Sequence, residues 1–352
     1  MLLVACSGKS PQQTGETKQL DMTDMAGRSV KLPAHPTRLL SNNLPGSILL
    51  YALAEDELIA RNNQPNQAER QFCTDRFCSL PQIGSWFMDN GTRNTEELIR
   101  LKPDLILSAG NIGQKAVEVS DRDQKLLQIP VVLFSTALPD LPETFRILGE
   151  LLDQKEKAAE LLSFYKTYIP DILQQSSELD SLKCPGVFLA MGEDGLQTAP
   201  ANSLHSQVLD YAGGRNVATI QYGEKSVSSH TAISIEQLMR WNPDIILACG
   251  FEDFDSKALQ QKILNDPRWK SLRAVQKRQV YQVPASPWLW LDRPPSVNQL
   301  LGVIWLAKLL HPDRFKYRVE DAASDFYAKF YHHRLSVAEL DALLSQGDAI
   351  TH

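Results

Sequence analysis

An internal repeat constrains the fold of this chain more than any other feature of its sequence. Residues 95–110 (TEELIRLKPDLILSAG) and residues 235–250 (IEQLMRWNPDIILACG) align without a gap at a constant offset of 140 residues. Eight of the sixteen aligned positions are identical, which is hard to obtain by chance. Solenoid repeats are much shorter, about 20–50 residues. The repeat therefore predicts two lobes of similar build.

Each copy of the repeat reads as a short helix, a Pro-Asp turn, a buried strand and a loop ending in glycine. Leu98, Ile99 and Leu101 form one apolar face of the first helix. Pro103 ends this helix, because the residue before a proline avoids the helical region. The apolar run 105–107 is typical of a strand covered on both faces. Ligands bind at the carboxyl ends of strands in open α/β sheets, so two such lobes predict a cleft.

Other short apolar runs between helical stretches predict an α/β fold class with mainly parallel central sheets. A long helix is predicted to bridge the two lobes, because apolar residues recur at helical spacing over residues 142–178. Pro142 suits its first turn, and Pro170 is expected to kink or interrupt it. The predicted units are a tether (1–19), an N-terminal α/β lobe (20–141), the bridging helix (142–178) and a C-terminal α/β lobe with terminal helices (179–352).

Charge and hydropathy exclude some classes of partner. The chain has 352 residues, and 36 Lys and Arg against 42 Asp and Glu give it a net charge of −6. Without a strongly basic block, a nucleic-acid partner held through its phosphates is not expected. No apolar run reaches the length of about 18 residues that a membrane-spanning helix needs.

Five segments, taken in order, resemble the class III substrate-binding proteins of ABC importers, a group that includes siderophore-, haem- and cobalamin-binding proteins. The resemblance covers roughly residues 20–315. It implies two α/β lobes bridged by one long helix, and a protein that delivers a ligand to a membrane permease without catalysing a reaction. The segments are 24–41, 94–110, 203–218, 233–250 and 266–284.

The resemblance also implies a docking role for two acidic residues. In that family a glutamate on each lobe contacts arginines of the permease dimer, and the matching positions here are Glu96 and Glu236. The repeat places the same residue at both positions. The simpler interpretation is that an acid stabilises a helix N-terminus through the helix dipole.

Two cysteine features bear on the cellular location. Leu3-Val4-Ala5-Cys6 resembles a lipoprotein lipobox, which implies a lipid anchor at Cys6 and a periplasmic or cell-surface protein. The charged and apolar regions that normally precede a lipobox are missing, so a chance match is the alternative. In an oxidising compartment Cys73 and Cys78 could form a disulfide, or they could remain free thiols.

The segment 286–296 (SPWLWLDRPPS) is the leading ligand-site candidate. Trp288 and Trp290 could stack on a flat ligand while Arg293 pairs with an oxyanion. Trp86 lies in a loop that the resemblance implies faces the ligand. Position alone suggests further cleft residues, three at or just after strand ends and one before the second repeat: Ser41, Asn43, Ser108 and His230.

Three functions remain open from the sequence. The first is an importer component, expected to be monomeric and without cofactor, that captures a metal chelate such as a ferric siderophore, haem or a corrinoid. The second keeps that role with a small oxyanion, molybdate or tungstate, which needs a small pocket with convergent polar groups and an arginine. The third is a metal-cluster enzyme of nitrogenase-like architecture, which the cysteine pattern does not favour. The histidines are scattered along the sequence, so a metal ligated by protein side chains is not expected in the site.

Overall fold

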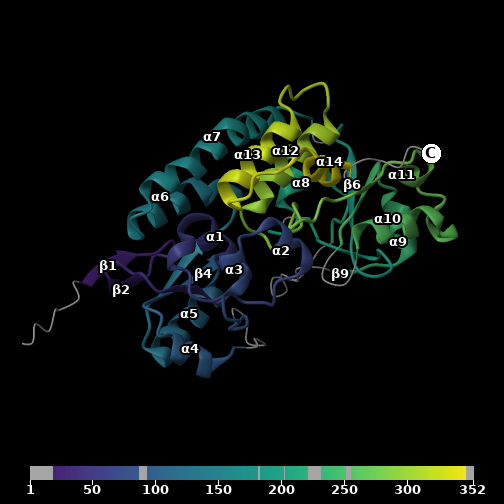
Figure 1. Cartoon of the computed structure of the whole chain (residues 1–352). Coiled ribbons are helices and arrows are strands. Elements are labelled where there is room, and N and C mark those ends of the chain that lie inside the picture. Colours follow the sequence, from purple (N-terminus) through teal and green to yellow (C-terminus); the bar gives the residue numbers. More distant parts are fainter. Residues whose placement is uncertain are drawn as a thin grey trace, which may run out of the picture.

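The computed structural model of the chain describes residues 19–86, 93–180, 183–201, 203–220, 231–250 and 255–345. These residues form two α/β lobes, each built round a parallel sheet (Figure 1). The predicted fold class is therefore confirmed. The N-terminal sheet has the order β3-β4-β5, with strands Leu39–Ser41, Leu105–Gly110 and Val131–Ser135. The C-terminal sheet has the order β11-β10-β6-β8, with strands Val280–Gln282, Ile245–Ala248, Gly186–Ala190 and Arg215–Asn216.

The repeat is visible as two matching helices at the predicted offset. Helix α4 spans Thr95–Leu101 and helix α9 spans Ile235–Trp241. Each begins at a polar cap, since Asn94 and Ser234 accept hydrogen bonds from the backbone three residues on. Each ends at a left-handed residue directly before the proline. The same local sequence therefore stops both helices in the same way and leads into β4 and β10.

The aspartate of each Pro-Asp turn ties its strand to the neighbouring strand. The Asp104 carboxylate accepts hydrogen bonds from the backbone of Thr37 and Arg38, just before β3. The Asp244 carboxylate accepts one from the backbone N–H of Gly186, where β6 begins, at 2.8 Å. This shared task explains why the repeat has an aspartate at both positions.

The connection between the lobes differs from the predicted single helix. It consists of α6 (Leu141–Leu151) and α7 (Lys155–Ser177), separated by a turn in which Asp153 has a φ of 56°. Pro170 lies inside α7 and does not end it. The apolar periodicity continues through the turn, so the sequence pattern did not reveal the break.

The C-terminal helices contact both lobes, since α12 (Asn298–Leu310) packs on α8 (Gln207–Tyr211). Helices α12 and α13 (Val319–Phe330) both pack on α7, and α13 also packs on α1 (Leu44–Ala54). The Tyr51 hydroxyl of α1 donates a hydrogen bond to the carbonyl of Tyr331, just after α13. The C-terminal segment therefore closes the molecule against its N-terminal lobe.

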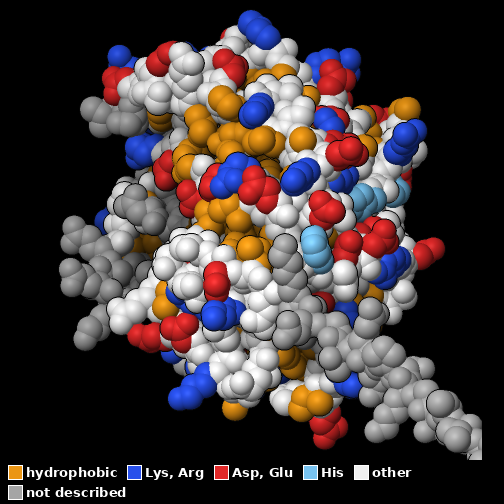
Figure 2. Space-filling model, turned by 90° about the vertical axis from the view of Figure 1, so that its left-hand side faces the viewer, with side chains coloured by type: hydrophobic (Ala, Val, Ile, Leu, Met, Phe, Trp, Pro, Cys, Tyr) orange, Lys and Arg blue, Asp and Glu red, His pale blue; other side chains and the backbone are white. Residues whose placement is uncertain are grey.

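The remaining elements cover the sheets and the surface. Charged side chains of both signs surround a central group of hydrophobic side chains on the face drawn in Figure 2. No helix of the described part is both long and apolar enough to cross a membrane.

The other helices are α2 (Gln67–Phe72), α3 (Asp75–Ser79), α5 (Gln114–Leu127), α8 (Gln207–Tyr211), α10 (Ser256–Asn265), α11 (Arg273–Gln276) and α14 (Val337–Ser345). Two antiparallel pairs join β1 (Gln19–Thr23) to β2 (Ser29–Pro33) and β7 (Gln197–Thr198) to β9 (Thr231–Ala232).

Candidate functional site

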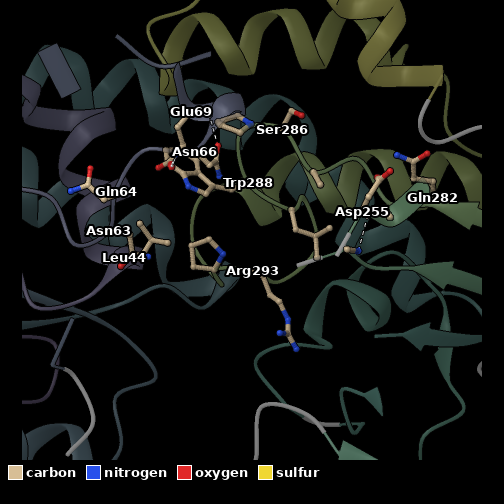
Figure 3. A pocket seen from close by; sticks show the side chains of 16 residues that line it. Leu44, Asn63, Gln64, Asn66, Glu69, Asp255, Gln282, Ser286, Trp288 and Arg293 are labelled. Carbon is tan, nitrogen blue, oxygen red and sulfur yellow. Dashed lines mark hydrogen bonds between the residues drawn. The ribbon is translucent and has the colours of Figure 1, made fainter. Parts of the chain in front are cut away.

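A cleft of about 320 Å³ lies between the two lobes (Figure 3). The N-terminal lobe contributes mainly side-chain amides, together with one apolar and one acidic residue. The C-terminal lobe contributes the ends of β10 and β11 and the loop that follows β11. The lining residues are Leu44, Asn63, Gln64, Asn66 and Glu69 on one side and Gly250, Asp255, Ser256, Gln282, Ala285, Ser286, Pro287, Trp288, Leu289, Arg293 and Pro294 on the other.

Two helices begin at this cleft, one from each lobe. Leu44 is the first residue of α1 and Ser256 is the first residue of α10, and both line the cleft. Their N-caps are satisfied, because Asn43 accepts from Gly46 N at 3.1 Å and Asp255 accepts from Lys257 N at 3.0 Å. The positive ends of two helix dipoles therefore point toward the same space, which favours negative charge there.

Of the predicted ligand residues that the structure describes, Trp288 and Arg293 line the cleft. The Trp288 ring is held edge-on by Tyr331, with ring centroids 5.1 Å apart, and is only 5% exposed. It forms a fixed apolar wall. The Arg293 side chain extends away from Trp288 in Figure 3 and contacts Met191 Sδ at 3.3 Å. Its guanidinium is the cationic group in the cleft lining.

A buried carboxylate positions the arginine. Asp292 is fully buried, and its Oδ2 lies 3.4 Å from Arg293 Nε and 3.2 Å from His205 Nδ1. Its Oδ1 has no hydrogen-bond partner. Neither Asp292 nor His205 was among the ligand-site candidates. His205 lies 87 residues from Asp292 along the chain, so no local pattern could have paired them.

The acid that the N-terminal lobe contributes to the cleft wall is already neutralised by a buried partner. Glu69 Oε1 accepts from Arg61 Nη2 at 2.7 Å, and the two side chains are 5% and 2% exposed. Glu69 Oε2 accepts from the backbone of Asn66 at 2.9 Å, which completes a capping box at the start of α2. The Arg61 guanidinium also lies over the Phe77 ring, 4.6 Å from its centroid. The Asn-x-x-Glu spacing is a local signal for such a cap, although it was not used above, and no local signal points to Arg61.

Two predicted tryptophans do not line this cleft. Trp290 is fully buried in the main core, and Trp86 is 4% exposed in a smaller core beneath the N-terminal sheet. The Arg93 guanidinium lies 5.8 Å from the Trp86 ring centroid. Both tryptophans act as packing residues in this structure. Trp288 and Trp290 lie two residues apart in one loop, and nothing in the local sequence tells which of the two is buried.

Two of the polar residues predicted from strand ends link the strands of the N-terminal sheet. Ser41 Oγ donates to the carbonyl of Leu107 at 2.8 Å, and Asn43 Nδ2 donates to the carbonyl of Ala109 at 2.6 Å. Ser108 is fully buried. None of the three is among the lining residues of the cleft. Two other candidates, His230 and Cys6, lie outside the described residues.

Cys73 and Cys78 are free thiols, so the disulfide considered from their spacing is not formed in this structure. Cys73 follows α2, and its burial raises the pKa of its thiol. Cys78 Sγ is instead directed at the carbonyl of Glu69, at 3.4 Å. Within the described ranges, no group of three or more His, Cys, Asp and Glu side chains comes together as a metal site.

Glu96 and Glu236 are exposed at the first turns of α4 and α9. Hydrogen bonds from its own backbone N–H and from the Ser234 hydroxyl lower the pKa of Glu236, which keeps its carboxylate charged at neutral pH. Both helices lie away from α6 and α7 in Figure 1. The two acids are therefore accessible to a large partner.

Sequence comparison finds relatives over most of the chain. The family model of the periplasmic binding proteins matches residues 87–287. The molybdate-binding protein MolA of Haemophilus influenzae is 24% identical, and the match covers 94% of this chain and 95% of MolA. The high-affinity heme uptake system protein IsdE of Staphylococcus aureus is 26% identical over 66% of this chain and 77% of its own length.

Solved structures share the fold along nearly the whole chain. An ABC transporter solute binding protein from Sulfurospirillum deleyianum is 28% identical, with a TM-score of 0.82 over 94% of this chain and 100% of that protein. The structure of MolA with molybdate bound is 21% identical, with a TM-score of 0.71 over 90% of this chain and 99% of MolA. Both matches include the two lobes and the segments that connect them.

Proposed function

The chain belongs to the periplasmic binding protein family, and from this membership we propose that it is the solute-binding component of an ABC importer. It captures a solute in the cleft between its lobes and delivers it to a permease. The observation that carries this proposal is the interlobe cleft, at which two helix N-termini and Arg293 converge. Capture and release need no covalent step.

We propose that the solute is a small oxyanion of the molybdate or tungstate kind. Arg293 supplies a positive charge, and the side-chain amides of Asn63, Gln64 and Asn66 supply hydrogen-bond donors. The helix dipoles of α1 and α10 add to the attraction. The two acids of the lining do not oppose it strongly, because Glu69 is paired with Arg61 and Asp255 caps α10. MolA, which aligns over most of the length of both chains, is a molybdate-binding protein.

The walls of the cleft favour an oxyanion over a flat metal chelate. A macrocycle needs aromatic faces to stack on, but Trp86 and Trp290 are buried elsewhere, and among the described residues Trp288 is the one aromatic side chain that lines the cleft. The cleft volume of about 320 Å³ is also at the small end of the usual range for ligand pockets. The chelate that the sequence first suggested therefore becomes the second candidate.

Calorimetric titration of the purified protein tests the ligand. We expect saturable binding of molybdate and tungstate, and no comparable binding of phosphate, haem, cobalamin or a ferric siderophore. Arg293→Gln removes a charge-assisted hydrogen bond, and we expect it to weaken molybdate binding about tenfold or more. Arg146→Gln, on the exposed face of α6, is the matched control and leaves the affinity unchanged.

The Trp288→Phe variant separates the two ligand classes. It keeps an apolar wall, so molybdate affinity stays within about threefold, whereas a chelate stacked on the indole would lose affinity. Tight binding of haem, a corrinoid or a siderophore together with no binding of molybdate would reject the oxyanion and retain the importer role.

We also propose how the protein reaches its permease. Glu96 and Glu236 dock onto basic groups of the permease dimer, and a lipid on Cys6 holds the protein at the membrane. Their exposure and equivalent placement on α4 and α9 support docking by the two glutamates. Replacing both with glutamine is expected to reduce ligand-dependent ATP hydrolysis by the reconstituted importer, with molybdate binding in solution unchanged.

A further inference from the structure

Two large apolar side chains are exposed at equivalent positions of the repeat. Ile99 on α4 is 64% exposed and Met239 on α9 is 43% exposed, and the two positions are 140 residues apart. The sequence pattern predicted that Ile99 would share a buried face with Leu98 and Leu101. In the structure Leu98 and Leu101 are buried and Ile99 is not, because Leu98 and Leu101 share one face of the short helix and Ile99 lies on another.

Each exposed apolar side chain lies beside one of the docking glutamates. Glu96 and Ile99 are three residues apart on α4, and Glu236 and Met239 are three residues apart on α9. Residues at this spacing are neighbours on a helix surface. Each lobe thus presents the same small surface, an acid next to a large apolar group, which we call the acid–apolar pair.

The neighbouring arginines are engaged within their own helices. Arg100 donates to the Glu97 carboxylate, with Nε–Oε2 at 2.8 Å, and Arg240 donates to the side chain of Gln237. Each arginine thus bonds a residue three positions earlier in its own helix. Each acid–apolar pair therefore presents one negative charge next to one apolar side chain. A partner surface with a basic group beside an apolar hollow would complement it.

A single exposed apolar residue on a protein surface needs no explanation. Two exposed apolar residues at equivalent positions beside equivalent acids do call for an explanation, because both copies of the repeat carry the same acid–apolar pair. A chain that carries the acid–apolar pair twice matches a partner that has the same complementary hollow twice. A dimer of identical subunits related by a two-fold axis has this property.

We propose that Ile99 and Met239 are paired apolar anchors that insert into equivalent hollows on the two subunits of the permease dimer. This inference rests on the proposed function. The glutamates pair with basic groups at the rim, and the anchors bury apolar area at the centre of each contact. Buried apolar anchors surrounded by polar contacts carry most of the binding free energy in protein interfaces.

Docking of the full-length protein to its permease complex, reconstituted in nanodiscs, tests the anchors. We expect Ile99→Ala and Met239→Ala each to weaken docking by about tenfold, because each removes most of a buried apolar side chain. The chain offers two controls of matched exposure. Leu126 on α5 is 64% exposed and Leu20 on β1 is 42% exposed, and we expect their alanine variants to dock normally.

A photocrosslinking amino acid at each position gives an independent measurement. Placed at 99 or at 239, it is expected to form an adduct with the same permease polypeptide, identified by mass spectrometry. Placed at 126, outside the repeat, it is expected to form none.

The outcomes separate this inference from the proposed function. If the wild-type protein docks and both anchor variants dock with the same affinity, the anchors are rejected and the importer role stands. If adducts from 99 and 239 map to different proteins, the two-fold partner is rejected. If the wild-type protein neither docks nor stimulates ATP hydrolysis, the importer role itself fails. Molybdate titration of each variant confirms that the cleft is intact.

Discussion

At the scale of single residues, the cleft wall depends on a buried ion pair. Arg61 and Glu69 are almost fully buried, and the Arg61 guanidinium also donates to the carbonyl of Asn63 in the cleft lining. Charges removed from water are stable only when they remain paired. The pair therefore fixes both the start of α2 and the shape of one side of the cleft.

Breaking this pair is expected to destabilise the whole protein. Arg61→Met leaves the Glu69 carboxylate buried without its partner, and we expect the free energy of unfolding to fall by about 3–5 kcal/mol. Urea denaturation measures this change. Arg146→Met, which breaks an exposed pair on α6, is the control and is expected to change little. The double variant Arg61→Met with Glu69→Gln recovers part of the loss; equal stability of the single and double variants would contradict the argument.

At the scale of elements, the two copies of the repeat end their helices in the same strained conformation. Lys102 has a φ of 47° and Asn242 has a φ of 42°. Each donates its backbone N–H to the carbonyl of the residue four positions earlier, Leu98 or Leu238. Pro103 and Pro243 prevent the helix from continuing, so the left-handed residue turns the chain toward the strand. The repeat thus encodes a helix end as well as a helix.

Glycine at these positions is expected to stabilise the protein unequally. A left-handed conformation costs an ordinary L-residue about 1–2 kcal/mol, and asparagine tolerates it better than lysine. Lys102→Gly is expected to raise the free energy of unfolding by roughly 0.5–1 kcal/mol, since the flexibility of glycine in the unfolded chain offsets part of the gain. Asn242→Gly is expected to gain less. Parallel urea titrations make the comparison, and a larger gain for Asn242→Gly would reverse the interpretation.

At the scale of the whole molecule, one hydrophobic core runs through both lobes. It includes strands of both sheets together with α6, α7, α12 and α13. Phe330 of α13 is fully buried, stacks on Phe326 at 4.4 Å and contacts Phe145 of α6 and Phe164 of α7. The C-terminal helices therefore make the two lobes one cooperative unit.

This continuity predicts a single unfolding transition. Circular dichroism and tryptophan fluorescence are expected to give coincident urea transitions, although the chain has two sheets. Phe330→Ala is expected to lower the free energy of unfolding by about 3–5 kcal/mol, because it leaves a cavity where three elements meet. Val337→Ala, at a position that is 78% exposed, is the control. Two separated transitions in the wild-type protein would show that the lobes fold independently.

Much of the fold and part of the site followed from the sequence. The repeat predicted α4, α9, β4 and β10, because helix periodicity, a proline and an apolar run are all local signals. The same unit placed Glu96 and Glu236 at the starts of exposed helices. The loop around Trp288 and Arg293 was also identified, because two tryptophans, a cation and two prolines are rare together.

The remaining features depend on contacts between distant parts of the chain. Which tryptophan of the loop faces the cleft is a tertiary property, since Trp290 is buried in the core that includes α12 and α13, whereas Trp288 lines the cleft. His205 meets Asp292 across 87 residues, and Tyr51 meets Tyr331 across 280. Ile99 belongs to the same class, since exposure is a property of the assembled lobe. Local sequence patterns determined which segments form helices and strands. Burial depends on contacts between distant segments, so only the tertiary structure determined which faces of these elements point to the cleft and which to a partner.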